Sequence, residues 1–374
     1  MKAQLLRHLK ARWVGAGWPS WCTFLVTKRC NARCRMCDSW RMPPSRELNP
    51  EEIYRIFSAV GPLDVVRLSG GEPFLRTDLL EVAVAVEKAS RPLVLHITTN
   101  GSFPERVEQL ARRFPRPKAL HFLVSVEGLA AEHDANRGRQ VTFAQVEETV
   151  RRLVQLRPSH GVKVAVNLTL SSPRALVQAE EVYRHFGRLG VEVNTVVAYA
   201  ASATYTLGFS HLPADQAAGY PLAPSLGTRE VRAFVSQELT RAGSHRAYSW
   251  RLWRRYYLQG LLSRLEGELS PYPRPRCTAL RYHLRINPDG SVPICQFNGS
   301  LLGNLLEIPF RQLWSSPRAE AARQWVDRCP GCWAECEAFP NALYSGDLLR
   351  WRWLWPALKR GVGRKPGGIA GHMG

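Results

Sequence analysis

The sequence contains no apolar run long enough to cross a membrane, and its opening residues do not form a signal peptide. Lys2, Arg7 and Lys10 interrupt the opening MKAQLLRHLKAR, whereas a signal peptide needs an unbroken apolar stretch. The nine cysteines are an odd number, which argues against a secreted disulfide framework. We therefore expect a cytoplasmic protein with reduced thiols, whose 374 residues suffice for one large domain and a smaller one.

Acidic residues are scarce as well. The chain has 31 Asp and Glu against 51 Lys and Arg, which gives a formal net charge of +20. A basic surface suits nucleic acid, anionic lipid or an acidic peptide, but an Arg-rich composition also follows from a GC-rich genome. No RNA-binding module is recognisable, so we do not expect a nucleic-acid partner.

The two ends of the chain concentrate this charge. Residues 1–20 contain four Lys or Arg and residues 341–374 contain six, against the single acid Asp347, and both segments contain tryptophan. We predict a basic amphipathic segment at 1–20 and a basic Trp-rich tail at 341–374. Such segments suit the interface of an anionic membrane, and the alternative is that both pack on the body of the protein.

Between residues 21 and about 200, short apolar or β-branched runs alternate with segments of helical period. The predicted strands are 22–27, 64–69, 93–98, 119–126, 162–170 and 191–200, and the predicted helices include 50–60, 77–89 and 143–156. This alternation indicates a parallel sheet with crossover helices. We predict an α/β fold in which residues 21–200 form a partial (β/α)6 TIM-like barrel.

Distinctive short sequences follow the first four predicted strands. They are RCNARCRMCDSW at 29–40, GGEP at 70–73, TNG at 99–101 and VEG at 126–128. Ligand sites in α/β folds lie at the carboxyl ends of the parallel strands. The four loops are therefore expected to converge on one binding site.

The first of these loops holds Cys30, Cys34 and Cys37 in the spacing CxxxCxxC. Thiolates commonly hold iron-sulfur clusters, and the absence of a nearby fourth ligand suits a cubane cluster that leaves one iron free. The alternatives are a structural zinc site or a disulfide loop. Cys22, inside the first strand, is most simply a buried small residue.

The combination of CxxxCxxC with GGEP resembles the radical S-adenosylmethionine (radical SAM) enzymes over roughly residues 20–340. This resemblance implies that the three cysteines bind a 4Fe-4S cluster whose open iron is chelated by the methionine part of S-adenosylmethionine. It also implies that Gly70, Gly71 and Glu72 meet the amino group of that ligand, where a carboxylate suits an ammonium.

The same resemblance extends to five further positions. It implies that Ser125 and Glu127 face the ribose or the substrate, that Asn167 hydrogen-bonds the ribose, and that Arg137 of HDANRG approaches the carboxylate of S-adenosylmethionine. Met36 occupies a position that is usually aromatic in the family and packs near adenine. The alternative for each polar residue is an ordinary cap, turn or satisfied polar group.

The C-terminal part of the chain has a different character. Residues 201–276 read as a helical connector, with a loop-like stretch at 212–231 and a helix at 249–265, and residues 277–340 form a smaller module. In this module two short strands are expected to form a hairpin around the turn at 287–290. The module carries five more cysteines, which are Cys277, Cys295, Cys329, Cys332 and Cys336.

The pattern C-x12-G-x4-C followed by CPGCWAEC resembles SPASM modules, and the shorter Twitch variant is the closer match. This implies a small β-hairpin/helix module with a second, auxiliary 4Fe-4S cluster. Four ligands suffice for one cluster, so one of the five cysteines is expected to be spare. A zinc ribbon is the alternative for this segment in isolation.

The resemblance implies an enzyme that reductively cleaves S-adenosylmethionine to methionine and a 5'-deoxyadenosyl radical, which abstracts a substrate hydrogen. A reducing partner such as flavodoxin or ferredoxin is implied too. The basic ends favour a lipid-like or small natural-product substrate and association with the cytoplasmic face of a membrane, and no leader-peptide-binding domain is apparent before residue 20. The alternatives are a maturase of ribosomal peptides or proteins and, more remotely, a non-catalytic iron-sulfur scaffold, against which the intact cysteine loop and Glu72 argue.

Overall fold

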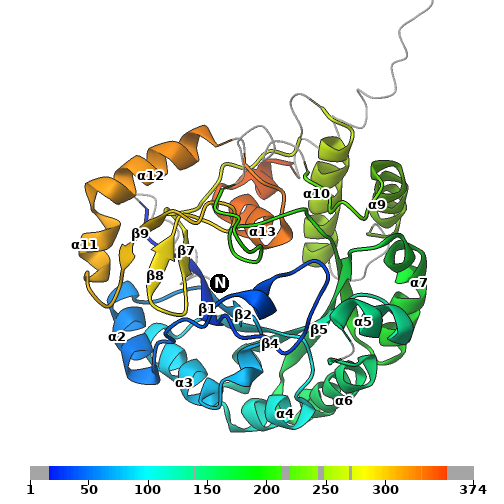
Figure 1. The fold of residues 1–374 in the computed structure, drawn as a ribbon, viewed down its shortest axis with the longest axis horizontal. Coiled ribbons are helices and arrows are strands. Elements are labelled where there is room, and N and C mark those ends of the chain that lie inside the picture. The colour runs from blue at the N-terminus through cyan, green and yellow to red at the C-terminus, as the bar shows by residue number, and fades with distance from the viewer. Residues whose placement is uncertain are drawn as a thin grey trace, which may run out of the picture.

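The computed structural model describes residues 17–138, 140–211, 220–242, 248–268, 272–329 and 331–351. These parts form an α/β fold around a seven-stranded parallel sheet with the strand order β6-β5-β4-β3-β2-β1-β7 (Figure 1). The strands are β1 Trp21–Thr27, β2 Val65–Gly70, β3 Val94–Thr99, β4 Leu120–Val126, β5 Lys163–Leu170, β6 Glu192–Val197 and β7 His283–Ile286. The first six lie at the predicted runs, and the predicted partial barrel is confirmed.

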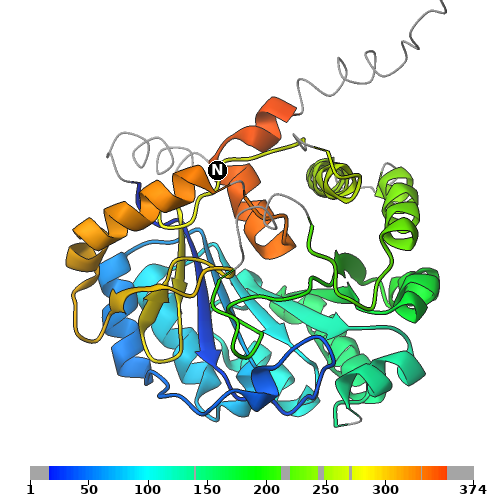
Figure 2. The same cartoon turned by 45° about the horizontal axis from the view of Figure 1, so that its top comes forward.

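Helices cover the outside of the sheet (Figure 2). They are α2 Pro50–Val60, α3 Leu79–Ser90, α4 Pro104–Arg113, α5 Ala130–Arg137, α6 Phe143–His160 and α7 Pro173–Arg188, with short 3-10 turns η1 Ser39–Arg41, η2 Pro73–Leu75 and η3 Pro117–Ala119. Local sequence explains where several of them begin. Asn49 and Glu52 form a capping box at the start of α2, and Thr142 and Gln145 form another at α6.

The strands alternate between an apolar and a polar face. Phe24, Leu68 and Ile97 point toward the helices and are fully buried, whereas Ser125 and Asn167 lie on the inner face of β4 and β5 and line a cavity. Successive side chains of a strand point to opposite sides. The outer face therefore supplies the hydrophobic core, and the inner face is left free to bind a ligand.

The connector contains two helices, α9 Thr228–Ala242 and α10 Tyr248–Leu265. The helix expected at 249–265 is confirmed by α10. Helix α9 begins inside the stretch 212–231, for which the sequence predicts a loop, so that prediction is wrong from Thr228 onward. Glycines and prolines before Thr228 made the whole stretch look like a loop. The helical period begins only after them, and its apolar positions include the buried Val231 and Val235.

The C-terminal module contains β8 Ser291–Pro293, β9 Leu301–Asn304, α11 Phe310–Trp314, α12 Pro317–Arg328 and α13 Glu335–Tyr344. The predicted hairpin partner is wrong, because β7 runs parallel to β1 in the main sheet, with Cys22 opposite Leu284. Strand β8 pairs instead with β9 in an antiparallel hairpin. All four residues of β7 are buried, as expected for a strand inside a parallel sheet.

The described residues of the two chain ends pack against the body of the protein. Trp18 donates from Nε1 to the carbonyl oxygen of Val60 at 2.8 Å, and Trp351 is buried against the ring of Tyr256. Residues 1–16 and 352–374, which carry most of the predicted basic ends, lie outside the described residues. Within the described parts, no helix is both long enough and apolar enough to span a bilayer.

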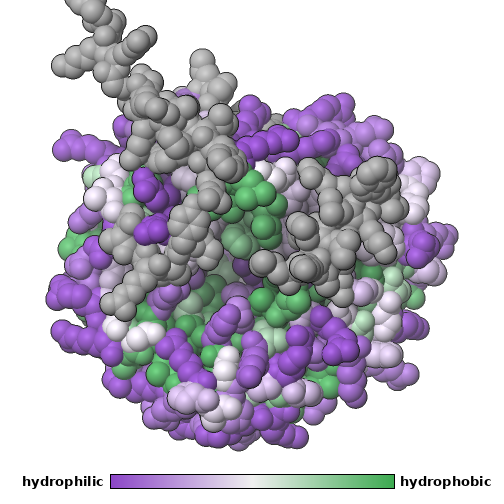
Figure 3. Space-filling model, turned by 180° about the vertical axis from the view of Figure 1, so that it is seen from behind, coloured by the Kyte–Doolittle hydropathy of each residue, from purple (hydrophilic) through white to green (hydrophobic). Residues whose placement is uncertain are grey.

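The face seen from behind has a mainly hydrophilic rim, while apolar side chains gather around a central hollow (Figure 3). This view looks onto the side of the molecule opposite to that of Figure 1.

Candidate active site

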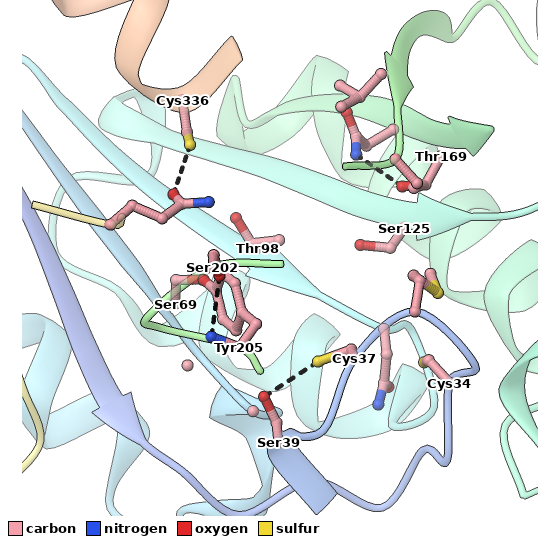
Figure 4. A pocket seen from close by; sticks show the side chains of 18 of the residues that line it. Cys34, Cys37, Ser39, Ser69, Thr98, Ser125, Thr169, Ser202, Tyr205 and Cys336 are labelled. Atoms are coloured by element: carbon pink, nitrogen blue, oxygen red, sulfur yellow. Dashed lines mark hydrogen bonds between the residues drawn. The ribbon is translucent and has the colours of Figure 1, made fainter. Parts of the chain in front are cut away.

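A cavity of about 280 Å³ lies among the carboxyl ends of the strands and the loops that follow them. Ten of the eleven residues predicted to bind the first cluster or S-adenosylmethionine line this one cavity, and they are Cys30, Cys34, Met36, Cys37, Gly70, Gly71, Ser125, Glu127, Arg137 and Asn167. Figure 4 shows Cys34, Cys37 and Ser125 on one side of it and Cys336 on the other. The strand ends thus converge as the parallel sheet predicts.

The cysteine loop after β1 is held by hydrogen bonds to its backbone. The amides of Arg33 and Arg35 donate to the carbonyl oxygens of Arg137 and Asn136, at 3.0 and 3.2 Å, at the end of α5. On the other side, the amide of Glu72 donates to the carbonyl oxygen of Arg29 at 2.8 Å. The loop is therefore clamped between α5 and the GGEP turn.

The two glycines of GGEP are required by this clamp. A Cβ atom on Gly71 would lie 2.0 Å from the carbonyl oxygen of Arg29, and one on Gly70 would lie 2.1 Å from that of Thr27. Gly70 also has a φ of 142°, which disfavours any other residue. Their absence of a side chain thus lets two backbone segments pack in contact at the cavity wall.

Glu72 is the one of these eleven residues that does not line the cavity. Its side chain is fully buried, and its carboxylate accepts hydrogen bonds from the amides of Asn100 and Phe74 and the hydroxyl of Thr99, at 2.6, 3.0 and 2.8 Å. Burial raises the pKa of this carboxyl, and the three donors oppose the rise. In this arrangement the carboxylate joins the GGEP turn to the loop after β3.

Glu127 and Arg137 form a bidentate ion pair, with Nε and Nη2 of Arg137 at 2.6 and 2.7 Å from the two carboxylate oxygens. Both side chains are buried at the cavity wall. His133 Nδ1 lies 3.3 Å from the same carboxylate, and burial lowers the pKa of His133 to about 4. The pair therefore joins the end of β4 to the helix end that clamps the cysteine loop.

The chemistry of the donors in the cysteine loop fits a cluster. Cys30, Cys34 and Cys37 are free thiols within eight residues, and all three face the cavity. Burial raises the pKa of Cys30 to about 11 and that of Cys34 to about 12, so a bound metal must displace their protons. Among the described residues, no group of three His, Cys, Asp or Glu side chains lies close enough together to hold a metal ion. The prediction of a cluster at these cysteines therefore rests on their thiol chemistry and on their place in the cavity wall.

The second cysteine set comes from separate parts of the module. Cys277 precedes β7, Cys295 follows β8, Cys329 caps α12, Cys332 precedes α13, and Cys336 lies in the first turn of α13. Burial raises the pKa of Cys295 and of Cys336 to about 12. Cys336 is the member that lines the cavity, where its Sγ donates to Oε1 of Gln296 at 2.8 Å (Figure 4).

A buried ionic group stands beside the second set. The carboxylate of Glu337 contacts His283 Nδ1 at 3.0 Å and Arg285 Nη1 at 2.8 Å, and all three side chains are buried. Burial alone would raise the pKa of Glu337, but His283 and Arg285 lower it to about 2. This carboxylate therefore stays ionised and ties α13 to β7, the strand that flanks β1.

Many residues that line the cavity were not predicted as site residues, and among them are Arg67, Tyr199, Tyr205, Arg285 and Gln296. Tyr205 lies in the segment after β6, and its carbonyl oxygen accepts a hydrogen bond from the amide of Asp38 at 2.8 Å. Burial raises the pKa of Tyr205, whose ring stands between the two cysteine sets in Figure 4. Contacts of such long sequence separation leave no local signal.

Arg67 did leave a signal, because it is a charged residue inside the apolar strand β2. Its Nε atom has no hydrogen-bond partner in the part of the chain that the structure describes, although the charge of Glu337 acts on the guanidinium. The guanidinium lines the cavity and lies over the ring of Trp21 with 5.7 Å to the ring centre. A guanidinium that faces a cavity without an ion pair is suited to an anionic group of a ligand.

Two parts of the chain match known protein families. The profile of the Radical SAM superfamily matches residues 24–171, and that of the SPASM iron-sulfur cluster-binding domain matches residues 277–336. The first match contains the cysteine loop and GGEP, and the second begins at Cys277 and ends at Cys336.

Among curated proteins, the GTP 3',8-cyclase of Aquifex aeolicus is 33% identical over 184 residues, which cover 46% of this chain and 54% of that protein. The probable GTP 3',8-cyclase of Thermococcus kodakarensis is 32% identical over 152 residues, or 38% and 47% of the two chains. The chain thus spans about half the length of these relatives. The pre-heme d1 synthase of Dinoroseobacter shibae is 24% identical over 340 residues, or 82% and 77%.

Two solved structures share the fold at low sequence identity. Native anSMEcpe with bound AdoMet has a TM-score of 0.59 and 15% identity, covering 93% of this chain and all of that one. SuiB of Streptococcus suis bound to S-adenosylmethionine has a TM-score of 0.56 and 12% identity, covering 86% and 72% of the two chains. Further structures contain anSMEcpe with the Cp18Cys peptide and SuiB with its precursor peptide SuiA.

Proposed function

The chain belongs to the radical SAM superfamily and carries a C-terminal SPASM domain, and on this premise we propose that it is a radical SAM enzyme that modifies a peptide or protein. The observation that carries the proposal is a single cavity reached by both cysteine sets, with Cys37 on one side and Cys336 on the other. A 4Fe-4S cluster on the first set would supply the electron that cleaves S-adenosylmethionine into methionine and a 5'-deoxyadenosyl radical.

The residues of the chain have separate tasks in this proposal. Cys30, Cys34 and Cys37 hold the cluster, and the backbone at Gly70 and Gly71 forms the wall against which the methionine part of S-adenosylmethionine binds. Polar side chains at the ends of β4 and β5 face the ribose. Because proximity and orientation are the main contributions of a protein to such a reaction, the clamped loop and rigid strand ends matter more than any single acid or base.

The lining of the cavity favours a peptide over a lipid chain. The surface of its lining is mainly apolar, with hydroxyl, amide, thiol and charged groups set among the apolar side chains. A peptide can offer apolar side chains to the first and backbone amide groups to the second, whereas an acyl chain would leave the polar groups without hydrogen bonds. The peptide-bound structures of anSMEcpe and SuiB, which share this fold, support the same choice.

A small anionic substrate is the second candidate, and Arg67 is the observation that favours it. Its guanidinium lines the cavity and has no carboxylate within ion-pair distance among the described residues, although the more distant charge of Glu337 acts on it. The relatives named GTP 3',8-cyclase match about half of their own length. Arg67 would bind a phosphate or carboxylate in this alternative and a peptide carboxylate or carbonyl group in the first.

The test measures which class of molecule gives up a hydrogen. The reconstituted enzyme is incubated under anaerobic conditions with dithionite, S-adenosylmethionine and a perdeuterated pool of peptides, nucleotides or lipid vesicles. Mass spectrometry then measures deuterium in the 5'-deoxyadenosine that forms. The matched control is the C30A/C34A/C37A variant, which should form no 5'-deoxyadenosine.

Deuterium transfer from the peptide pool supports the proposal, and transfer from the nucleotide pool establishes the second candidate instead. Transfer from the lipid vesicles would overturn both. If the wild type forms no 5'-deoxyadenosine under any condition although its iron and sulfide contents are complete, the radical reaction itself is contradicted.

A further inference from the structure

The outer surface of the cysteine loop carries exposed basic side chains directly above the thiols. Arg33, Arg35, Trp40 and Arg41 are all exposed, and we call this set the loop face. The side chains of Cys34 and Cys37, in the same loop, face the cavity on the inner side. The loop face is therefore separated from the proposed cluster site only by the thickness of one loop.

The positive charge of the loop face is only partly neutralised. Arg29, next to it, pairs with Glu47 at 3.0 Å, and Arg41 lies 3.6 Å from Asp38. Arg33 and Arg35, by contrast, have no carboxylate partner in the described ranges of the chain. These two guanidinium groups keep their full charge for a partner.

An exposed tryptophan stands within this charge. The Trp40 side chain is 38% exposed, and the guanidinium groups of Arg33 and Arg41 lie 5.5 and 5.1 Å from its ring centre. Tryptophan and arginine are the residue types most enriched where proteins bind one another. The loop face thus combines an aromatic contact with a basic surround.

We propose that the loop face is the docking surface for a small acidic protein that carries one electron, such as a flavodoxin or ferredoxin. The inference rests on the proposed function, which requires an electron at the Cys30, Cys34 and Cys37 site. In the step, the carrier is oxidised by one electron and that site is reduced by one. Complementary charge speeds such an encounter and orients it, and weak electron-transfer interfaces are small.

The rigidity of the loop suits this role. The backbone amides of Arg33 and Arg35 are fixed to the end of α5, and a Cβ atom on Gly138 would lie 2.9 Å from the Cβ of Arg33, so no side chain could stand between helix and loop. The charges are therefore presented in a fixed pattern, which lowers the entropy lost on binding. A membrane or nucleic acid also carries negative charge, but neither delivers the electron that the proposed function requires at this site.

The test compares R33E/R35E with R184E/R188E, a control that makes the same charge change on exposed positions of α7. One readout is the association rate constant with a flavodoxin, measured by biolayer interferometry at low and high salt. The other is the rate of 5'-deoxyadenosine formation driven by the reduced flavodoxin, divided by the rate driven by dithionite. Dithionite is small and does not need the docking surface.

For R33E/R35E we expect the association rate and the flavodoxin-driven rate to fall about tenfold or more at low ionic strength, with the dithionite rate unchanged. R184E/R188E should match the wild type in both. Equal flavodoxin rates for the two variants would overturn the inference, as would a wild-type association rate that does not fall with salt. Absence of a dithionite-driven rate in the wild type would instead contradict the proposed function.

Discussion

The two cysteine sets differ in how the chain builds them. The first occupies eight residues of one loop, whose backbone is clamped by α5 and the GGEP turn. The second spans sixty residues, from Cys277 to Cys336, and its placement depends on the packing of β7, the β8-β9 hairpin, α12 and α13. The first set is thus positioned by local backbone contacts, whereas the second is positioned by contacts between segments far apart in the chain.

The surroundings of the two cysteine sets differ as well. The first set has exposed arginines outside it and a cavity inside. The second stands beside the buried Glu337, His283 and Arg285 group and against Phe297 and Ala334. We infer that the first set is the reactive centre and that the second is chiefly structural or electronic, and four predictions test this division.

The largest expected effect separates the two sets directly. C30A/C34A/C37A should lower dithionite-driven 5'-deoxyadenosine formation to background and lower the iron content from about eight to about four atoms per chain. C277A/C295A should also lose about four irons but retain a measurable rate. Iron analysis and chromatography of the nucleoside check both. If the two variants lose the reaction equally, the proposed division is wrong.

The second prediction concerns backbone contact at the first set. Gly71→Ala places a Cβ 2.0 Å from the carbonyl oxygen of Arg29, so the GGEP turn and the cysteine loop must separate. We expect loss of the first cluster and of S-adenosylmethionine binding, measured by electron paramagnetic resonance and calorimetry. The control is Gly187→Ala in α7, where an added Cβ would meet no neighbouring side chain or segment within 4 Å. Helix propensity predicts that this variant gains up to about 1 kcal/mol in the free energy of unfolding.

The third prediction concerns the buried ionic group beside the second set. Glu337→Gln removes a charge that pairs with Arg285 and His283, which leaves a buried guanidinium uncompensated. We expect the free energy of unfolding to fall by about 3–5 kcal/mol, measured by denaturant titration. Asp347→Asn, which keeps an acceptor for the Tyr256 hydroxyl, should cost about 1 kcal/mol. Equal losses of unfolding free energy in the two variants would mean that the buried Glu337, His283 and Arg285 group stabilises the fold no more than an ordinary hydrogen bond does.

The smallest expected effect lies again at the first set. Glu72→Gln replaces a carboxylate oxygen by an NH2 group where Asn100, Phe74 and Thr99 all donate. One donor is then left without an acceptor, which should cost about 1–3 kcal/mol. The KM for S-adenosylmethionine should rise as the loops after β2 and β3 separate. An unchanged KM with reduced stability would show that Glu72 serves the fold alone.

Local patterns in the sequence are sufficient to predict six strands of the sheet and most residues of the candidate site. The carboxyl ends of parallel strands share one edge, so residues near these ends and in the loops after them can be expected from the sequence alone to meet. Ten of the eleven predicted residues do line one cavity. The inward orientation of Glu72 could not be expected, because it depends on amides after β3.

The remaining features depend on contacts between distant residues. The four residues of β7 read equally well as one arm of a hairpin, and their pairing with β1 is decided by packing between segments 260 residues apart in the chain. Tyr205 and Gln296 reach the cavity in the same way. Arg67 could have been predicted from the sequence, because a charged residue inside an apolar strand usually has a specific partner or function.

The place of β7 has a consequence for synthesis on the ribosome. Strand β1 ends at Thr27, yet its neighbour on one side, β7, is complete only at Ile286. Until then a nascent chain exposes the amides and carbonyls of β1 as an unpaired edge, which invites wrong pairing with other chains. Translation must therefore pass residue 286 before this side of the sheet is covered, and we expect chains truncated at residue 200 to require a chaperone to stay unaggregated.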